Sequence, residues 1–272
     1  MIHETIDLWR DGEYNGADKN FRPTLDTYVL KDGGKKGAVL IFPGGGYVMT
    51  SWREAEPIAA WVNAAGYHAF VLNYSVAPNK HPQPLLDAAK AIRVIREHAE
   101  TWRVDADKIA VCGFSAGGHL AASLGVHYDA PYLQTEEGAD AEKNRPNALI
   151  LCYPVITSGD RAHRGSFDNL LGKDASEEML HYMSLEKQVK PNTPPAFLWA
   201  TFNDGAVPVE SSLTFAAALR ENGVPFELHI FPDGVHGLSL CNQQTWDGND
   251  ALVNPQVSVW TDLCKTWLKA TL

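Results

Sequence analysis

The sequence predicts an α/β fold with a mostly parallel central sheet and helices on both of its faces. Short apolar runs alternate along the chain with stretches whose apolar residues recur at helical spacing. The apolar runs are nearly continuous, as in strands that are buried on both faces of a sheet. With 272 residues, of which 45% are hydrophobic, the chain fits a single domain over residues 1–272.

In the first half of the chain, the initial 30 residues are expected to form strands or extended structure at the sheet edge. Residues 84–102 give the clearest helical pattern, because Leu85, Ala88 and Ile92 share one face. The elements expected after residue 30 are strands at 38–43, 68–74 and 108–114, and helices at 54–66, 84–102 and 115–127.

The second half repeats the alternation, which indicates parallel strands joined by right-handed crossovers. The expected elements are strands at 147–154, 195–202 and 226–232, and helices at 209–223 and 257–270. Two segments interrupt the pattern. Residues 129–146 are acidic and irregular, and residues 157–194 carry only short helical patches. The second segment is interpreted either as a small lid insertion over the carboxyl edge of the sheet or as a long surface connection.

Charge and cysteine content narrow the function classes. The 23 basic and 33 acidic residues give a net charge of −10, which disfavours nucleic-acid and anionic-membrane partners. This charge fits either solubility or a preference for neutral or cationic substrates. The four cysteines form no C-x-x-C pair and no H-E-x-x-H is present, so the sequence carries no zinc signature. Cys112 and Cys152 lie in apolar runs and are interpreted as buried hydrophobic residues.

The N-terminal sequence lacks a basic region followed by an apolar run, so no signal peptide is predicted. No apolar stretch approaches the roughly 18–20 residues that a membrane helix needs. A cytoplasmic location is therefore expected, with secretion as the alternative where a leader has been removed. The sequence leaves the oligomeric state open.

The hexapeptide G-F-S-A-G-G at 113–118 is the strongest chemical signal. A glycine-rich turn would explain the glycines alone, but here a predicted strand runs directly into Ser115 and a predicted helix follows it. This strand–turn–helix context is that of a nucleophile elbow, in which Gly113 and Gly117 permit a tight turn and close packing. Ser115 is therefore predicted to be a catalytic nucleophile.

A serine nucleophile needs a base, and His236 is the best of the ten histidines. It lies in a glycine-containing loop after the last strand, whereas His98, His127 and His229 lie near helix ends or inside a strand. Asp204 follows the preceding strand and is predicted to orient His236. The rival carboxylate, Asp233, is better suited to shaping the Pro-Asp-Gly turn.

Donors for a developing oxyanion are predicted at two places. One is the N–H of Ala116, the residue after the serine. The others are the N–H groups of Gly45 and Gly46 in F-P-G-G-G-Y, which follows the first strong strand. A flexible turn is the alternative, and a phosphate loop is disfavoured because no G-K-[ST] follows. Tyr47 and Trp52 are candidates for the substrate pocket, with core packing as an equal alternative.

Together these stretches resemble the α/β-hydrolase superfamily, and within it the bacterial acetyl xylan esterase and feruloyl esterase group related to prolyl-oligopeptidase-like hydrolases. The resemblance covers roughly residues 38–240. It implies the triad Ser115, Asp204 and His236, and hydrolysis of small acyl esters without metal or organic cofactor. His119 recurs in the motif and is expected to pack and hydrogen-bond rather than act as a second base. This chain departs from the His-Thr-x-Asp-Asp pattern of the group at Ala200 and Asn203.

The predicted function is that of a serine carboxylesterase acting on acetyl groups of sugars or xylo-oligosaccharides. A feruloyl esterase or a broad carboxylesterase is the first alternative. A small-peptide serine peptidase and a non-catalytic binding protein on the same fold are the more distant alternatives. The expected partner is thus a small-molecule or oligosaccharide ester.

Overall fold

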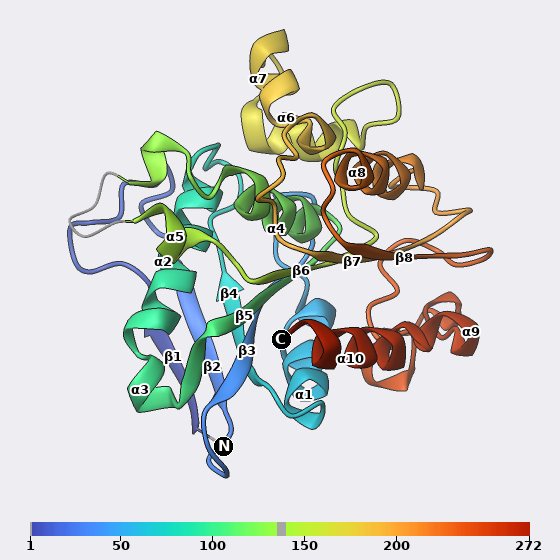
Figure 1. The fold of residues 1–272 in the computed structure, drawn as a ribbon. Helices are drawn as coiled ribbons and strands as arrows, with labels where there is room; N and C mark the ends of the chain where they lie inside the picture. The colour runs from blue at the N-terminus through green and yellow to red at the C-terminus, as the bar shows by residue number, and fades with distance from the viewer. Residues whose placement is uncertain (1, 135–139) are drawn as a thin grey trace.

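An eight-stranded sheet organises the protein, in a computed structural model that describes residues 2–134 and 140–272 (Figure 1). The strand order is β1-β2-β4-β3-β5-β6-β7-β8. The pairs β1/β2 and β2/β4 are antiparallel, and the other pairs are parallel. The strands are β1 (Ile2–Asp7), β2 (Thr24–Val29), β3 (Lys36–Phe42), β4 (His68–Asn73), β5 (Val104–Phe114), β6 (Ala148–Cys152), β7 (Ala196–Thr201) and β8 (Phe226–Phe231).

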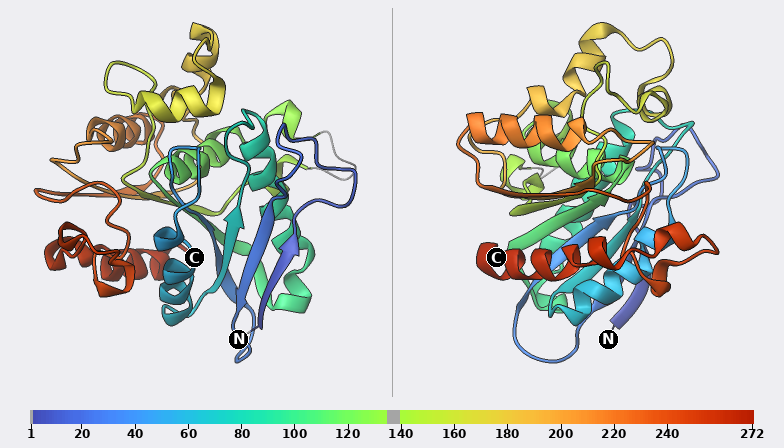
Figure 2. Two further views of the ribbon diagram at one scale, coloured as in Figure 1. Left: turned by 180° about the vertical axis from the view of Figure 1, so that it is seen from behind. Right: turned by 90° about the vertical axis from the view of Figure 1, so that its right-hand side faces the viewer.

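Helices cover both faces of the sheet, as Figures 1 and 2 show. Helices α1 (Glu56–Ala64) and α10 (Trp260–Thr271) lie on one face, with the short α9 (Pro255–Ser258) before α10. The other face carries α2 (Gln83–Glu97), α3 (Ala99–Trp102), α4 (Ala116–His127) and α8 (Glu210–Glu221). This is the predicted α/β-hydrolase fold, with the antiparallel edge strands where extended structure was expected.

Strand β3 shows why the sheet separates two apolar cores. Its side chains alternate in direction, so Leu40 and Phe42 pack into the core beneath α2 and α4. Val39 and Ile41 pack into the core beneath α1 and α10. All four are fully buried, which explains the unbroken apolar run in the sequence.

Several helix boundaries differ from those predicted. The helix expected at 84–102 is two helices that meet at His98, whose ring nitrogen Nδ1 lies 2.9 Å from the Val94 carbonyl. The helix expected at 54–66 begins as a 3₁₀ turn, η1 (Trp52–Glu54), and continues as α1. The strand expected at 108–114 begins earlier, at Val104. Cys112 and Cys152 are buried free thiols, as predicted.

Residues 157–194 contain two α-helices, α6 (Arg164–Leu171) and α7 (Glu177–Tyr182), and a 3₁₀ helix, η3 (Leu185–Lys187), between β6 and β7. In Figure 1, α6 and α7 lie beyond α4 and α8, on the same side of the sheet. Their use as a lid concerns movement and stays a prediction. Within the described part of the chain, no helix is long and apolar enough to cross a membrane.

Candidate active site

Ser115 occupies a sharp turn between β5 and α4. Its backbone has φ 53° and ψ −119°, a conformation that costs a non-glycine residue on the order of 1–3 kcal/mol. Neighbouring glycines make room for the turn. A Cβ on Gly113 would lie 2.1 Å from the Gly117 carbonyl oxygen, and one on Gly117 would lie 2.0 Å from that of Phe42. The structure therefore has the strand–turn–helix geometry predicted for a nucleophile elbow.

Three side chains from separate loops form a hydrogen-bonded chain at this turn. The Ser115 hydroxyl lies 2.8 Å from His236 Nε2, and His236 Nδ1 lies 2.7 Å from Asp204 Oδ2. Because the carboxylate only accepts, Nδ1 carries the proton and Nε2 is left to accept from Ser115. The Asp204 side chain is 1% exposed, and its other oxygen accepts the N–H groups of Ala206 and Val207.

The loop that carries His236 is fastened to the end of β7. Asn203 Nδ2 donates to Asp233 Oδ1 at 2.9 Å, and Asn203 Oδ1 accepts the N–H of Gly234. Thr201 Oγ1 donates to the Gly234 carbonyl at 2.8 Å. Asp233 thus shapes the turn, as expected, and Asn203, one departure from the group pattern, holds the turn that bears the histidine.

The glycine loop lies beside the serine. The N–H of Gly44 donates to Glu54, while the described residues offer no hydrogen-bond partner to the N–H groups of Gly45 and Gly46. Ala116 begins α4, where the helix itself supplies no acceptor for its N–H. A Cβ on Gly45 would lie 2.1 Å from the Met49 carbonyl oxygen, so the loop can close only with glycine at this position.

Tyr47 holds this loop against α4. Its side chain is 1% exposed, and its hydroxyl lies 2.9 Å from His119 Nδ1. His119 Nε2 lies 3.0 Å from the Met183 carbonyl and must donate to it, so Tyr47 donates to Nδ1. Burial lowers the pKa of His119 to about 4, which keeps the ring neutral. The structure therefore favours core packing for Tyr47 over the alternative of pocket lining. His119 packs and hydrogen-bonds, as expected.

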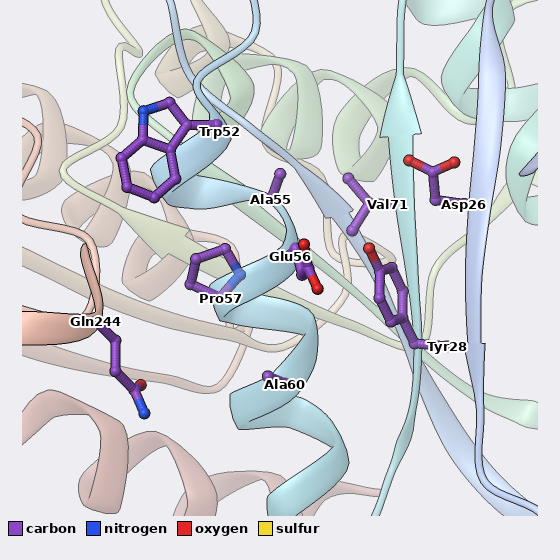
Figure 3. Close-up of a pocket in the computed structure, with 9 residues that line it drawn as sticks. All are labelled: Asp26, Tyr28, Trp52, Ala55, Glu56, Pro57, Ala60, Val71 and Gln244. Atoms are coloured by element: carbon purple, nitrogen blue, oxygen red, sulfur yellow. The ribbon is translucent and has the colours of Figure 1, made fainter. Parts of the chain in front are cut away.

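Trp52, in contrast, is 57% exposed and lines a pocket of about 510 Å³ on the α1 side of the sheet (Figure 3). Figure 3 shows residues from η1 and α1, from β2 and β4, and from the segment around Gln244 surrounding it. The triad side chains are not among its lining. The pocket lining comprises Asp26, Tyr28, Trp52, Ala55, Glu56, Pro57, Ala60, Val71 and Gln244.

Sequence reasoning missed four residues around the site. Glu54 and Tyr153 are buried and hydrogen-bonded to each other at 2.6 Å. Asn169 Nδ2, on α6, donates to the Gly46 carbonyl at 2.8 Å. His163 has its pKa lowered by burial and by the nearby His236. Tyr153 lies in Y-P-V-I-T, one of the stretches that carry the resemblance, but the sequence predicts no role for it. The contacts of these residues join segments up to 123 positions apart, so the sequence alone does not reveal them.

The fold and this hydrogen-bonded chain define the class of protein, an α/β hydrolase. The BD-FAE family model matches residues 25–219, and the chain belongs to the BD-FAE family. A crystal structure of an acetyl ester-xyloside bifunctional hydrolase from Caldicellulosiruptor lactoaceticus is 41% identical, with a TM-score of 0.88 over 98% of this chain and 96% of that one. Carboxylesterase Cest-2923 from Lactobacillus plantarum is 30% identical, with a TM-score of 0.84 over 99% and 98%.

Two curated relatives are longer proteins. Endo-1,4-beta-xylanase B of Butyrivibrio fibrisolvens is 44% identical over 246 residues, which are 89% of this chain and 39% of that protein. Acetylxylan esterase of Xylanibacter ruminicola is 32% identical over 209 residues, 75% of this chain and 41% of that protein. The chain therefore spans about two fifths of the length of these relatives.

Proposed function

We propose that this protein is a serine carboxylesterase that removes small acyl groups, above all acetyl groups, from sugars such as xylo-oligosaccharides. The observation that carries the proposal is the hydrogen-bonded chain from Ser115 through His236 to Asp204 at a strained strand–helix turn. The similarity to an acetylxylan esterase and to an acetyl ester-xyloside hydrolase supports the choice of ester.

The proposed reaction has two halves. Ser115 Oγ attacks the ester carbonyl while His236 Nε2 takes its proton, and Asp204 stabilises the imidazolium that forms. The proton then passes from His236 to the leaving sugar oxygen, and an acyl group remains on Ser115. Water, activated in turn by His236, attacks the acyl-enzyme and releases the acid with the serine restored.

The tetrahedral intermediates carry a negative oxygen that needs donors. In the proposal, the N–H groups of Gly45, Gly46 and Ala116 supply them, since none is used by another described group. The position of Ala116 at the N-terminus of α4 adds the positive end of a helix dipole.

The pocket lined by Trp52 is suited to bind the sugar part of the substrate. An exposed indole offers a flat apolar face to a pyranose ring, and the oxygens of Asp26, Glu56 and Gln244 can accept its hydroxyls. Trp52 lies in η1, the same turn as the Glu54 that binds the glycine loop. Trp52→Ala should raise KM for acetylated xylo-oligosaccharides and leave turnover of p-nitrophenyl acetate unchanged.

The experiment compares hydrolysis of a p-nitrophenyl ester series, acetylated xylo-oligosaccharides, methyl ferulate and a peptide p-nitroanilide. Acetyl esters should be the best substrates, and Ser115→Ala should lower the rate by about 10⁴-fold or more. Faster turnover of methyl ferulate would favour the feruloyl esterase alternative. Cleavage of the anilide alone would favour a peptidase, and no turnover at all would favour a binding protein.

A further inference from the structure

Glu54 is a buried carboxylate next to the reaction site. Glu54 is 3% exposed and lies in the turn η1, between the glycine loop and α1. The neighbouring Arg53 does not pair with it, because its guanidinium binds the carbonyls of Gly237 and Thr245 and the carboxylate of Asp247. Among the described residues Glu54 has no ion-pair partner, so hydrogen bonds alone offset its burial.

One oxygen of Glu54 fixes the glycine loop. Oε2 accepts the N–H of Gly44 at 2.7 Å, so this N–H is already paired. The two N–H groups that follow, on Gly45 and Gly46, are left without described partners. The fit is close: a Cβ on Gly44 would lie 2.7 Å from Oε2 and 3.0 Å from the Ser115 Cβ. Glu54 therefore stands directly behind the turn that carries the serine.

The other oxygen fixes the histidine loop through Tyr153. The Tyr153 hydroxyl donates to Glu54 Oε1 at 2.6 Å and accepts the N–H of Ser239 at 2.9 Å. The Tyr153 ring also packs edge-on against His236, with centroids 5.1 Å apart. Ser239 Oγ closes the connection by donating to the Arg53 carbonyl. One carboxylate thus connects both loops that must meet at Ser115.

From these contacts we infer that Glu54 is a positioning residue for ester hydrolysis, whose two oxygens hold the Gly45–Gly46 donors and the His236 base in register with Ser115. The inference rests on the proposed function. A carboxylate suits this task because both oxygens accept and charge-assisted hydrogen bonds are short and strong. A neutral amide has a single accepting oxygen and would have to give up one of the two contacts.

The test compares Glu54→Gln and Tyr153→Phe with the unmodified protein. Losing an oxyanion donor costs about 10²–10³-fold in kcat, so displacing the loop should cost about 10–10²-fold for Glu54→Gln, with KM for p-nitrophenyl acetate within about twofold. Tyr153→Phe keeps the Gly44 contact and should lose less. Binding of a short trifluoromethyl ketone, which forms a tetrahedral adduct on the serine, should weaken in parallel with kcat.

Two controls separate the outcomes. Glu97→Gln removes an exposed carboxylate on α2 and should leave kcat unchanged. Ser115→Ala tests the proposed function itself, and activity retained in this variant would contradict that function. If Ser115→Ala is inactive but Glu54→Gln is folded and fully active, only the role of Glu54 is overturned. A raised KM with unchanged kcat would also overturn it. If Glu54→Gln does not fold, Tyr153→Phe becomes the test. A Tyr153→Phe protein whose kcat and ketone affinity equal those of the unmodified protein would overturn the proposed link from Glu54 to the histidine loop.

Discussion

Replacement of Gly117 by alanine probes the packing that holds Ser115 in place. The added Cβ would lie 2.0 Å from the Phe42 carbonyl oxygen and 2.6 Å from that of Pro43, both backbone atoms of the adjoining strand and loop. Real contacts of this kind rarely fall below 3.0 Å, so β3 and α4 must separate by about 1 Å. Such overpacking costs about 1–3 kcal/mol or more in stability, and a 1 Å misplacement costs about 10²-fold in rate.

The assay is kcat/KM on p-nitrophenyl acetate together with the midpoint of thermal unfolding. Gly34→Ala is the matched control, because a Cβ there meets nothing within 4 Å and no positive φ is involved. We expect a large loss of activity and stability for Gly117→Ala and none for Gly34→Ala. A Gly117→Ala protein with wild-type activity and unfolding midpoint would refute the close-packing account of the elbow.

The hydrogen bonds of Asp204 and Asn169 and the burial of three histidines can be tested in the same way. Asp204→Asn should lower kcat by about 10³–10⁴-fold, because the amide donates to Nδ1 and forces the His236 proton onto Nε2; near-normal kcat would contradict this tautomer. Asn169→Ala removes the hydrogen bond to the Gly46 carbonyl and should lower kcat up to about tenfold at constant KM; an effect on KM alone would contradict it. Acidification should destabilise the fold, because burial lowers the pKa of His81, His119 and His127 to about 4, so the unfolded chain takes up protons first. The loss begins near pH 6.5 and grows towards pH 4, and Asp87, whose pKa is raised to about 6, opposes part of it. Urea unfolding at pH 7.5 and pH 4.5 measures this, and equal stabilities would contradict it.

Local patterns explain how much of the fold could be predicted. Buried parallel strands are continuous apolar runs and amphipathic helices repeat every 3.6 residues, so β3 and α2 were recognisable without any structure. The break between α2 and α3 at His98 could not be predicted, because residues 98–102 continue the helical composition. The second helix ends at Arg103, which adopts the left-handed conformation. Boundaries of this kind depend on tertiary packing rather than on propensity.

The candidate active site also has a part that could be predicted from the sequence and a part that could not. Ser115 and the glycine loop lie in short motifs, and Asp204 and His236 follow predicted strands at the edge where such loops meet. Glu54 stands in no motif, and Y-P-V-I-T at 153–157 belongs to the family resemblance without assigning Tyr153 a role. Their contact joins positions 99 residues apart, so the sequence does not bring them together. A buried, hydrogen-bonded carboxylate is recognised only when its environment is known.

The most direct test of the central claim is to identify the residue that a fluorophosphonate probe modifies. The account predicts stoichiometric labelling of the peptide that contains Ser115, no labelling of Ser115→Ala, and much slower labelling of His236→Ala, since the 2.8 Å contact between Ser115 Oγ and His236 Nε2 is lost. Labelling at another serine, or full esterase activity in Ser115→Ala, would contradict it.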